Sequence, residues 1–358
     1  MHISLSTIHG SDNYGAVLQA SCLAHCLAEH GTVEVLDHRP MILNLGYLQD
    51  CLPYQVLRRR VNPQFVTFLR KHARMRRVHD ELLPLGPRVR RRPVAADYGL
   101  ADVAVVGSDE VWSDLWGYQP HFFLADAPSS TRRVAYAVSA GRSTTWKAAD
   151  QIATQLDRFD SVLVRDANTA RLATAAGRAP DDVVCDPVLL VDPDHLRRLA
   201  AGAMPPAPPA GSYVLLYLES CRPDPAVADA IDAFDGPRRT ISCGFPHPGA
   251  EERIADGPAE LLRLVDGAAL VITTMFHGVV TALALDTPVA VIQHPAKAAK
   301  IDDLLRRLDV GPLDQRDGYA FVPGAGDLDG FRSRSRLALA AALTGDRAEP
   351  ARRGSVAS

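Results

Sequence analysis

Several features that would assign this chain to a special class are missing from its 358 residues. No apolar run approaches the roughly 18–20 residues that a membrane span requires, and the N-terminus has neither the basic start nor the long apolar core of an export signal. The net charge is only -3, which gives no general attraction to nucleic acid. There is no internal repeat and no Gly-x-Gly-x-x-Gly dinucleotide fingerprint. We therefore expect a cytoplasmic globular protein that binds no nucleic acid and makes at most peripheral contact with a membrane.

The six cysteines are scattered and form no Cys-x-x-Cys pair, which is typical of reduced thiols in a cytoplasmic protein. Cys22, His25 and Cys26 have helical spacing, but no second pair of ligands lies near them in the sequence. We therefore predict that they belong to a packed helix face, and we predict no metal site in the chain.

What the sequence does contain is an alternation of apolar strands and helices on both sides of a proline-rich segment. The apolar fraction of 47% and the length suit two domains of ordinary size. The alternation predicts an α/β fold of two doubly wound, Rossmann-like domains that face each other across a cleft. The predicted parts are a first domain at 1–202, a linker at 203–211, a second domain at 212–330, a helix at 331–346 that packs back on the first domain, and a disordered tail at 347–358.

Residues 58–92 interrupt the alternation, because they carry twelve Lys and Arg residues against Asp80 and Glu81. We predict a helical excursion with a solvated basic face. The excursion is either an arginine-rich surface insertion or a surface that attracts a membrane or a polyanionic, lipid-linked acceptor.

Polar residues follow the predicted strands, at the edge of a parallel sheet where ligands bind. After the strand at 3–8, Asp12 can accept a proton from a hydroxyl, and Gly15 lets the backbone approach a ligand. After the strand at 103–106, Asp109 and Trp112 can hold a sugar by hydrogen bonds and stacking. Helix caps would explain Asp12, Asn13, Ser108 and Asp109 equally simply.

Arg165 ends the apolar strand at 161–164, where its side chain would project into the cleft. A guanidinium suits the bidentate clamping of a phosphate or a carboxylate. An ion pair with Asp166 or Asp186 is the alternative.

The most informative segment is 270–292, in which a buried strand at 270–272 passes into a short helix at 278–285. His277 lies at that transition, where free backbone N–H groups and the helix dipole favour an anion. An acid–base side chain beside an anion site predicts an enzyme that acts on a phosphorylated or carboxylated substrate. A histidine satisfied within the core is the alternative.

These motifs, in this order, resemble the polysaccharide pyruvyl transferase family. The resemblance covers roughly residues 3–310 and is carried by DNYGAVLQA at 12–20, GSDEVW at 107–112, YAVSAG at 136–141, VRD at 164–166, DP at 186–187, FHG at 276–278 and KIDDLL at 300–305. Each motif alone is weak, but their occurrence in register is specific to the family.

The resemblance implies a two-domain fold like that of GT-B glycosyltransferases. It also implies that phosphoenolpyruvate donates its three-carbon unit to two hydroxyls of a saccharide or sugar-like acceptor as a ketal, with release of phosphate and with no cofactor or metal. In this scheme His277 is the general acid, Asp12 accepts or orients the acceptor hydroxyl, and Arg165 clamps the donor. The implied substrate-binding residues are Asn13, Tyr14, Gly15, Ser108, Asp109, Trp112, Ser139, Arg142, Arg165, Thr274, Gly278 and Lys300.

One position departs from the family. Two residues before His277, many members have arginine and others have serine, whereas this chain has Met275. Either another cation such as Arg165, Arg142 or Lys300 replaces the arginine, or the donor has changed. The alternatives to the pyruvyl transferase are a nucleotide-sugar glycosyltransferase of GT-B-like architecture and a non-catalytic partner protein with the same fold.

Overall fold

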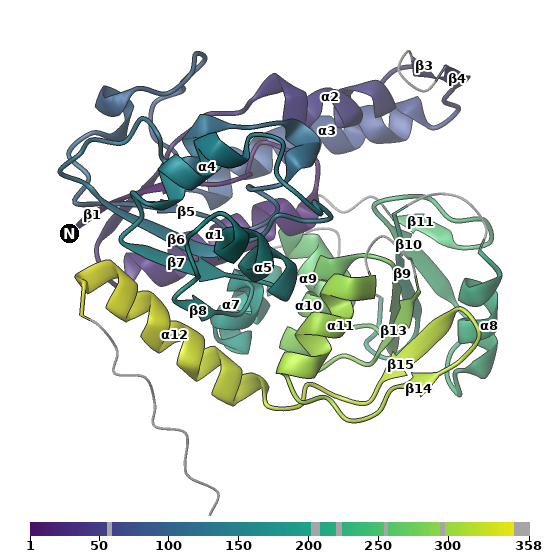
Figure 1. Ribbon diagram of the computed structural model, residues 1–358. Helices are drawn as coiled ribbons and strands as arrows, with labels where there is room; N and C mark the ends of the chain where they lie inside the picture. Colours follow the sequence, from purple (N-terminus) through teal and green to yellow (C-terminus); the bar gives the residue numbers. More distant parts are fainter. Residues whose placement is uncertain (56–58, 202–207, 220–223, 254–256, 294–297, 347–358) are drawn as a thin grey trace, which may run out of the picture.

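A computed structural model describes residues 1–55, 59–201, 208–219, 224–253, 257–293 and 298–346. These residues form two α/β units, each built on its own sheet (Figure 1). The prediction of two doubly wound units is therefore confirmed. Most of the predicted linker at 203–211 and the whole predicted tail at 347–358 lie outside the described residues.

The sheet of the N-terminal unit has six parallel strands, which are β1 (His2–Ser6), β2 (Thr32–Val35), β5 (Val103–Val106), β6 (Arg132–Val138), β7 (Ser161–Val164) and β8 (Asp182–Val183). Their order is β2-β1-β5-β6-β7-β8. Strands β5 and β7 are buried along their whole length, as expected for a parallel sheet covered on both faces. The order reverses between β1 and β5, so the carboxyl ends of these two strands form the switch point at which ligands bind in such sheets.

The sheet of the C-terminal unit has seven strands, which are β9 (Val214–Tyr217), β10 (Thr240–Cys243), β11 (Glu251–Arg253), β12 (Leu270–Thr273), β13 (Val289–Ile292), β14 (Asp314–Gln315) and β15 (Tyr319–Val322). Their order is β11-β10-β9-β12-β13-β15-β14, with the switch point between β9 and β12. The sheet is not wholly parallel, because β15 is antiparallel to both β13 and β14. The sequence did not predict this edge, since β14 is only two exposed residues long.

Helices cover both sheets: α1 (Tyr14–Ala28), α4 (Ala149–Leu156), α5 (Ala167–Ala175), α6 (Pro187–Leu190), α7 (Pro193–Ala201), α8 (Pro225–Ala233), α9 (Pro258–Asp266), α10 (Phe276–Ala284), α11 (Ala298–Arg307) and α12 (Leu328–Thr344). One apolar core runs through the junction of the units and includes Leu5 and Leu23 on one side and Leu215 and Val280 on the other. The two units are therefore packed against each other. In the described part of the chain, no helix is long and apolar enough to cross a bilayer.

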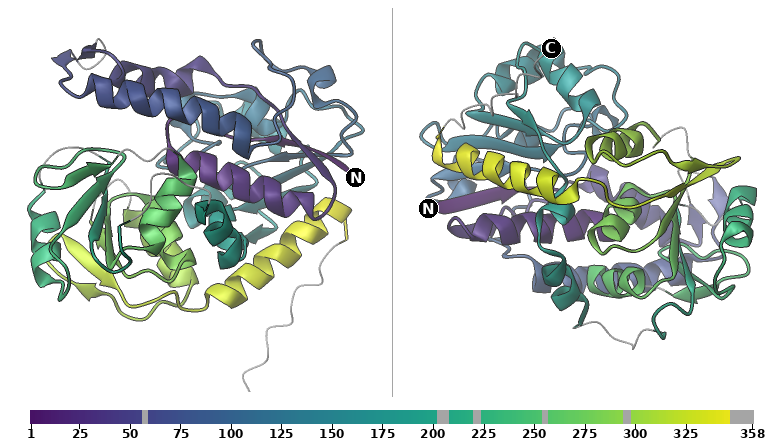
Figure 2. Two further views of the ribbon diagram at one scale, coloured as in Figure 1. Left: turned by 180° about the vertical axis from the view of Figure 1, so that it is seen from behind. Right: turned by 90° about the horizontal axis from the view of Figure 1, so that it is seen from below.

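Helix α12 leaves the C-terminal unit and runs back along the N-terminal unit (Figure 2). Several hydrogen bonds attach it there. Arg132 Nε donates to the carbonyl of Ala342 at 2.7 Å, and the backbone N–H of Cys185 donates to Ser335 Oγ at 2.9 Å. Arg332 Nε donates to the carbonyl of Leu189 at 2.8 Å.

A two-helix arm leaves the N-terminal unit after β2 and consists of α2 (Met41–Asp50), the strands β3 (Tyr54–Gln55) and β4 (Arg60–Val61), and α3 (Phe65–Leu82). In Figure 1 its β3–β4 end lies farthest from the N-terminal sheet. The predicted basic excursion at 58–92 therefore needs correction. Residues after 82 return to the body, where Val35 is bridged to Leu85. Three of their four arginines are ion-paired, in the pairs Arg88–Asp37, Arg91–Asp97 and Arg92–Asp126.

Candidate active site

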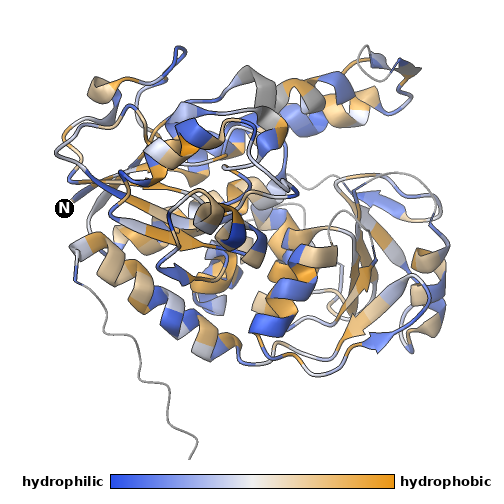
Figure 3. Cartoon of the chain, viewed as in Figure 1, coloured by the Kyte–Doolittle hydropathy of each residue, from blue (hydrophilic) through white to orange (hydrophobic). Residues whose placement is uncertain are grey.

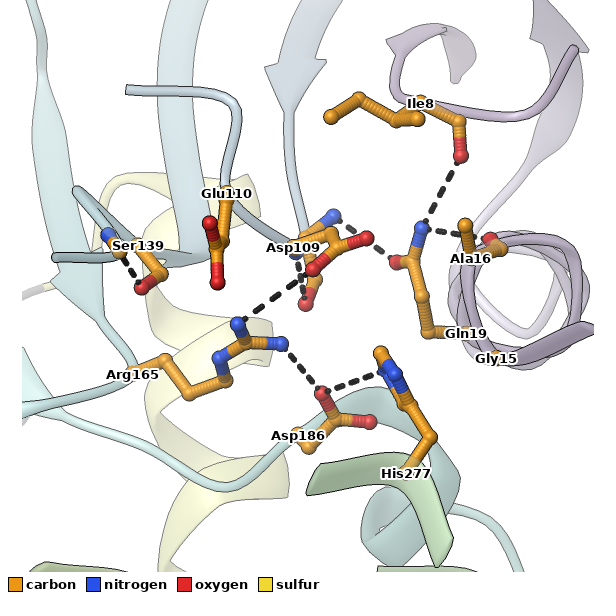
Figure 4. Close-up of polar contacts among 12 residues, drawn as sticks. Ile8, Gly15, Ala16, Gln19, Asp109, Glu110, Ser139, Arg165, Asp186 and His277 are labelled. Atoms are coloured by element: carbon orange, nitrogen blue, oxygen red, sulfur yellow. Dashed lines mark hydrogen bonds and ion pairs between the residues drawn. The ribbon is translucent and has the colours of Figure 1, made fainter. Parts of the chain in front are cut away.

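The candidate site lies where loops of the N-terminal unit meet the first turn of α10 (Figure 4). A small pocket at this junction is lined by Arg165 and Asp186 from the N-terminal unit and by Phe276 and Lys300 from the C-terminal unit. All four residues belong to motifs that the sequence singled out. The charged residues among them come from both units, two cations and one carboxylate.

His277 occupies the first turn of α10, which starts at Phe276, two residues earlier than predicted. The turn into the helix is fixed by Thr273, whose Oγ1 donates to the carbonyl of Tyr217 at 2.6 Å and accepts the N–H of Met275 at 2.9 Å. Gly278 is required beside it, since a Cβ at this position would lie 2.2 Å from Thr273 Oγ1. The predicted position of His277 at a strand-to-helix transition is confirmed.

The imidazole of His277 faces the other unit and not apolar core. Its Nε2 lies 3.6 Å from Asp186 Oδ2, and the residue is 6% exposed. A Cβ on Gly15 would lie 2.4 Å from both Cγ and Nδ1 of the ring. Glycine at position 15 is therefore what lets the imidazole approach the start of α1 so closely. The sequence predicted a close approach at Gly15, and the neighbour that makes it is His277.

Asp186 is buried between Arg165 and His277. Its Oδ2 accepts Arg165 Nη1 at 2.8 Å, while its Oδ1 accepts the backbone N–H of Val188 at 3.0 Å and so caps α6. Burial by itself would raise the pKa of Asp186, but interaction with His277 and the charge of Arg165 lower it to about 2. The carboxylate therefore stays ionised. The sequence considered Asp186 only as a partner of Arg165 and missed its contact with His277.

Arg165 and Lys300 are the two cations of the pocket, and the ring of Phe276 lies near both. The guanidinium carbon of Arg165 is 4.7 Å from the ring centroid, and Lys300 Nζ is 5.9 Å from it. Arg165 Nη2 also lies 3.5 Å from Asp109 Oδ1, and Lys300 pairs with Glu110 of the opposite unit. A phosphate or carboxylate that enters the pocket must therefore compete with these acidic groups for the cations.

Asp12 belongs to a second carboxylate–histidine pair, which the sequence did not predict. Both of its carboxylate oxygens lie 3.0 Å from Nδ1 of His72, which α3 contributes. Burial raises the pKa of Asp12, although His72 and the neighbouring Lys71 act in the opposite direction. Lys71 is itself buried, with its ammonium 4.3 Å from the centroid of Tyr14. The arm helix therefore completes this part of the site.

Asp12, Cys51 and His72 offer one ligand atom each within 4.8 Å, which makes them a group that could hold a metal ion. One observation favours a hydrogen-bonded group instead, since His72 Nδ1 is already bonded to Asp12. Burial raises the pKa of the Cys51 thiol to about 11.

Several predicted substrate-binding residues make bonds within the protein. Asn13 Oδ1 accepts the backbone N–H groups of Gly15 and Ala16 as the cap of α1, which is the alternative role that the sequence left open. Ser139 Oγ donates to Asp166 at 2.6 Å. The backbone N–H of Ser108 donates to Gln19 Oε1 at 3.1 Å. Thr274 Oγ1 accepts the N–H of Glu219 at 2.9 Å.

The structure corrects the prediction that Trp112 stacks on a sugar. The indole is 1% exposed and packs within the N-terminal unit, where its ring is parallel to Phe123 at 5.2 Å and its Nε1 donates to the carbonyl of Phe122. Tyr14 is equally buried, beneath Lys71. Arg142 is exposed and has no ion pair with any described residue.

Met275, at the position where many family members carry arginine, is the residue before α10 and packs against the apolar core. Cations nevertheless remain at this end of α10, because Arg165 and Lys300 lie on either side of the pocket. Both were among the replacements that the sequence suggested.

Comparisons with known proteins agree with the motifs. A sequence model of the family described as polysaccharide pyruvyl transferase matches residues 13–295. None of the curated proteins matches the chain.

Among solved structures, the UDP-N-acetylglucosamine 2-epimerase from Rickettsia bellii is similar over 97% of this chain and 92% of its own, with 10% identity and a TM-score of 0.44. The glycosyltransferase SnogD from Streptomyces nogalater is similar over 97% of this chain and 94% of its own, with 17% identity and a TM-score of 0.39. The E. coli ADP-heptose lps heptosyltransferase II is similar over 97% of this chain and 100% of its own, with 14% identity and a TM-score of 0.33. TM-scores below 0.5 support neither a shared activity nor a shared substrate.

Proposed function

The chain belongs to the polysaccharide pyruvyl transferase family, and on that premise we propose that it moves the three-carbon unit of phosphoenolpyruvate onto two hydroxyls of a saccharide or sugar-like acceptor. The product is a ketal, and phosphate is released. The observation that carries the proposal is the contact of His277 with Asp186, a residue that lines one pocket together with Arg165 and Lys300. An acid, its carboxylate and two cations are what an enol phosphate requires.

The first step is a proton transfer from His277 to the methylene carbon of the donor. The enol double bond is consumed, and positive charge develops on the carbon that carries the phosphate oxygen. A positioned general acid contributes roughly 10²–10⁴-fold to such a step. Asp186 stabilises the charged imidazole and orients it, because it is an ionised carboxylate 3.6 Å away.

The acceptor then adds to the positively charged carbon. One hydroxyl forms the first C–O bond and gives its proton to Asp12, whose raised pKa makes the carboxylate a better base. Cleavage of the bond between this carbon and the phosphate oxygen releases phosphate. The second hydroxyl closes the ketal, and its proton leaves with the phosphate. Arg165 and Lys300 bind the donor's anionic groups, which guanidinium and ammonium groups do well.

The test is the release of phosphate from phosphoenolpyruvate by the purified chain with a panel of saccharides. We expect release that depends on the saccharide, together with a product heavier by the pyruvate ketal in mass spectrometry. We also expect phosphoenolpyruvate to raise the thermal transition of the protein, because a ligand that binds the native state stabilises it.

Two outcomes would replace the proposal. Stabilisation by a nucleoside diphosphate, without stabilisation by phosphoenolpyruvate, would favour a nucleotide-sugar glycosyltransferase. Failure of both donors to bind at millimolar concentration, with a stable complex formed with another biosynthetic enzyme, would favour a non-catalytic partner protein.

A further inference from the structure

The arm exposes an unusual concentration of apolar side chains. Of the twelve large apolar side chains exposed on the described residues, seven lie within it. We call these seven the arm tip: Leu45, Leu48, Leu52, Tyr54, Val61, Val66 and Leu69. They follow the chain from the second half of α2 through β3 and β4 into the first turns of α3. Single exposed leucines are ordinary, but a cluster of this kind marks an interaction site.

The opposite face of α3 is already occupied. Phe68 packs on Phe245 of the C-terminal unit with ring centroids 5.4 Å apart, and Lys71 lies over Tyr14. His79 Nε2 is hydrogen-bonded to the carbonyl of Ser11 at 3.1 Å. These contacts fix α3 to the body and turn its other face outward.

The outward face of α3 is apolar in the first turns of the helix and basic further along. Val66, Arg70 and Arg77 lie on one side of the helix, because spacings of four and eleven residues return to the same face. Arg70, Arg76 and Arg77 are exposed and have no ion pair with any described residue. Arg70 lies directly after Leu69, whereas from Leu69 to Arg77 the helix rises about 12 Å, so Arg76 and Arg77 are set back from the apolar end. Figure 3 shows both orange and blue segments on the arm.

We infer that the arm tip docks on an anionic lipid bilayer. Its apolar side chains enter the interfacial region, and the arginines of α3 contact lipid phosphates. A soluble polyanion would account for the arginines but not for seven exposed apolar side chains. An apolar groove in a partner protein would account for the apolar side chains but not for the arginines. Apolar groups flanked by basic ones are typical of segments that bind anionic membrane surfaces without crossing them.

Docking through this arm has a consequence for the site. The same helix carries His72 and Lys71 on its inner side, next to Asp12 and Tyr14. A docked arm therefore holds the Asp12 part of the site near the membrane surface, where an acceptor carried on a lipid would be presented. This consequence rests on the proposed function, whereas the docking itself does not.

The experiment is co-sedimentation of the full chain with vesicles of phosphatidylcholine alone and with vesicles that also contain phosphatidylglycerol. We expect binding to the anionic vesicles only, weakened by salt. The double variant Leu52→Glu/Val61→Glu should lose at least about tenfold of the binding, and each of Arg70→Ala and Arg77→Ala about fivefold. The matched controls are Leu337→Glu on α12 and Arg198→Ala on α7, both at exposed positions of the body.

Three results would overturn the inference. The first is no sedimentation with anionic vesicles, or equal losses in the control variants. The second is binding that needs the arginines but not Leu52 and Val61, which would indicate a soluble polyanion. The third is self-association of the chain that the double variant abolishes, which would make the arm tip an interface between copies. Unchanged phosphate release with a soluble acceptor would show that the double variant is folded and that the proposed activity is independent of docking.

Discussion

Two carboxylate–histidine pairs lie near the start of α1, and they differ in the state of the carboxylate. Asp186 faces His277, and Asp12 faces His72. Both aspartates are buried. Yet the pKa of Asp186 is lowered to about 2, whereas the pKa of Asp12 is raised.

The difference comes from the balance between burial and the neighbours of each carboxylate. Interaction with His277 lowers the pKa of Asp186 most, and Arg165 and the N–H of Val188 lower it further, so that together they outweigh its burial. Asp12 has the charges of His72 and Lys71, but its burial outweighs them and Asp50 adds to the effect. A firmly ionised carboxylate suits the support of an acid, and a carboxylate with a raised pKa suits a base. The same two residue types thus serve two roles, and variants can test the assignment.

The largest expected effect is on turnover. His277→Ala removes the proton donor, and we expect kcat to fall by at least about a hundredfold, as general acids usually contribute. Binding of phosphoenolpyruvate should change much less, because Arg165 and Lys300 remain. Phosphate release measures the first quantity and thermal shift the second. His25→Ala, at an exposed position of α1, is the control, and a loss below about tenfold in His277→Ala would contradict the role given to His277.

The next effect is on stability. Arg165→Ala leaves Asp186 buried without its main ion-pair partner, and breaking a buried pair typically costs about 3–5 kcal/mol. We expect the free energy of unfolding in urea to fall by about that amount. Arg239→Ala is the control, because Arg239 forms an exposed pair with Glu251, and such pairs contribute less than about 1 kcal/mol. Similar losses of unfolding free energy in the two variants would show that the Arg165–Asp186 pair stabilises the protein no more than an exposed ion pair does.

The third expected effect is on the pH dependence of kcat/KM and concerns the Asp12–His72 pair. A base must be ionised to act, so the acidic side of the kcat/KM profile should rise with pH through the pKa of Asp12. His72 lowers that pKa, so in His72→Gln the rise should move to higher pH. Asp50→Asn should move it to lower pH, since Asp50 raises the pKa. Profiles that do not move, or that move in the same direction in both variants, would remove Asp12 from the role of base.

These pairs also show how far the sequence could predict the molecule. The strands at 103–106, 161–164 and 289–292 were predicted at their observed bounds, because short buried apolar runs between polar residues are a local signal. The position of His277 at a strand-to-helix turn is local in the same way. The contacts of Asp186 with His277 and of Asp12 with His72 cross 91 and 60 residues, and no local pattern reports such pairings.

Contacts made in the folded chain explain the remaining differences from the sequence prediction. Trp112 follows a strand end and so resembled a sugar-stacking residue, but three aromatic neighbours, Phe123, Trp146 and Phe159, enclose its ring. The basic excursion resembled one solvated helix, but Arg88, Arg91 and Arg92 find carboxylate partners on the body.

The smallest effect concerns the pair that joins the two units across the pocket. Lys300 and Glu110 are partly exposed, so their pairing contributes less than about 1 kcal/mol. Glu110→Gln keeps the shape of the side chain and frees the ammonium group for the donor. We expect KM for phosphoenolpyruvate to fall, by no more than about fivefold, with kcat unchanged. Lys300→Met should raise KM instead. Equal changes in the two variants would mean that Lys300 supports the junction of the units and does not bind the donor.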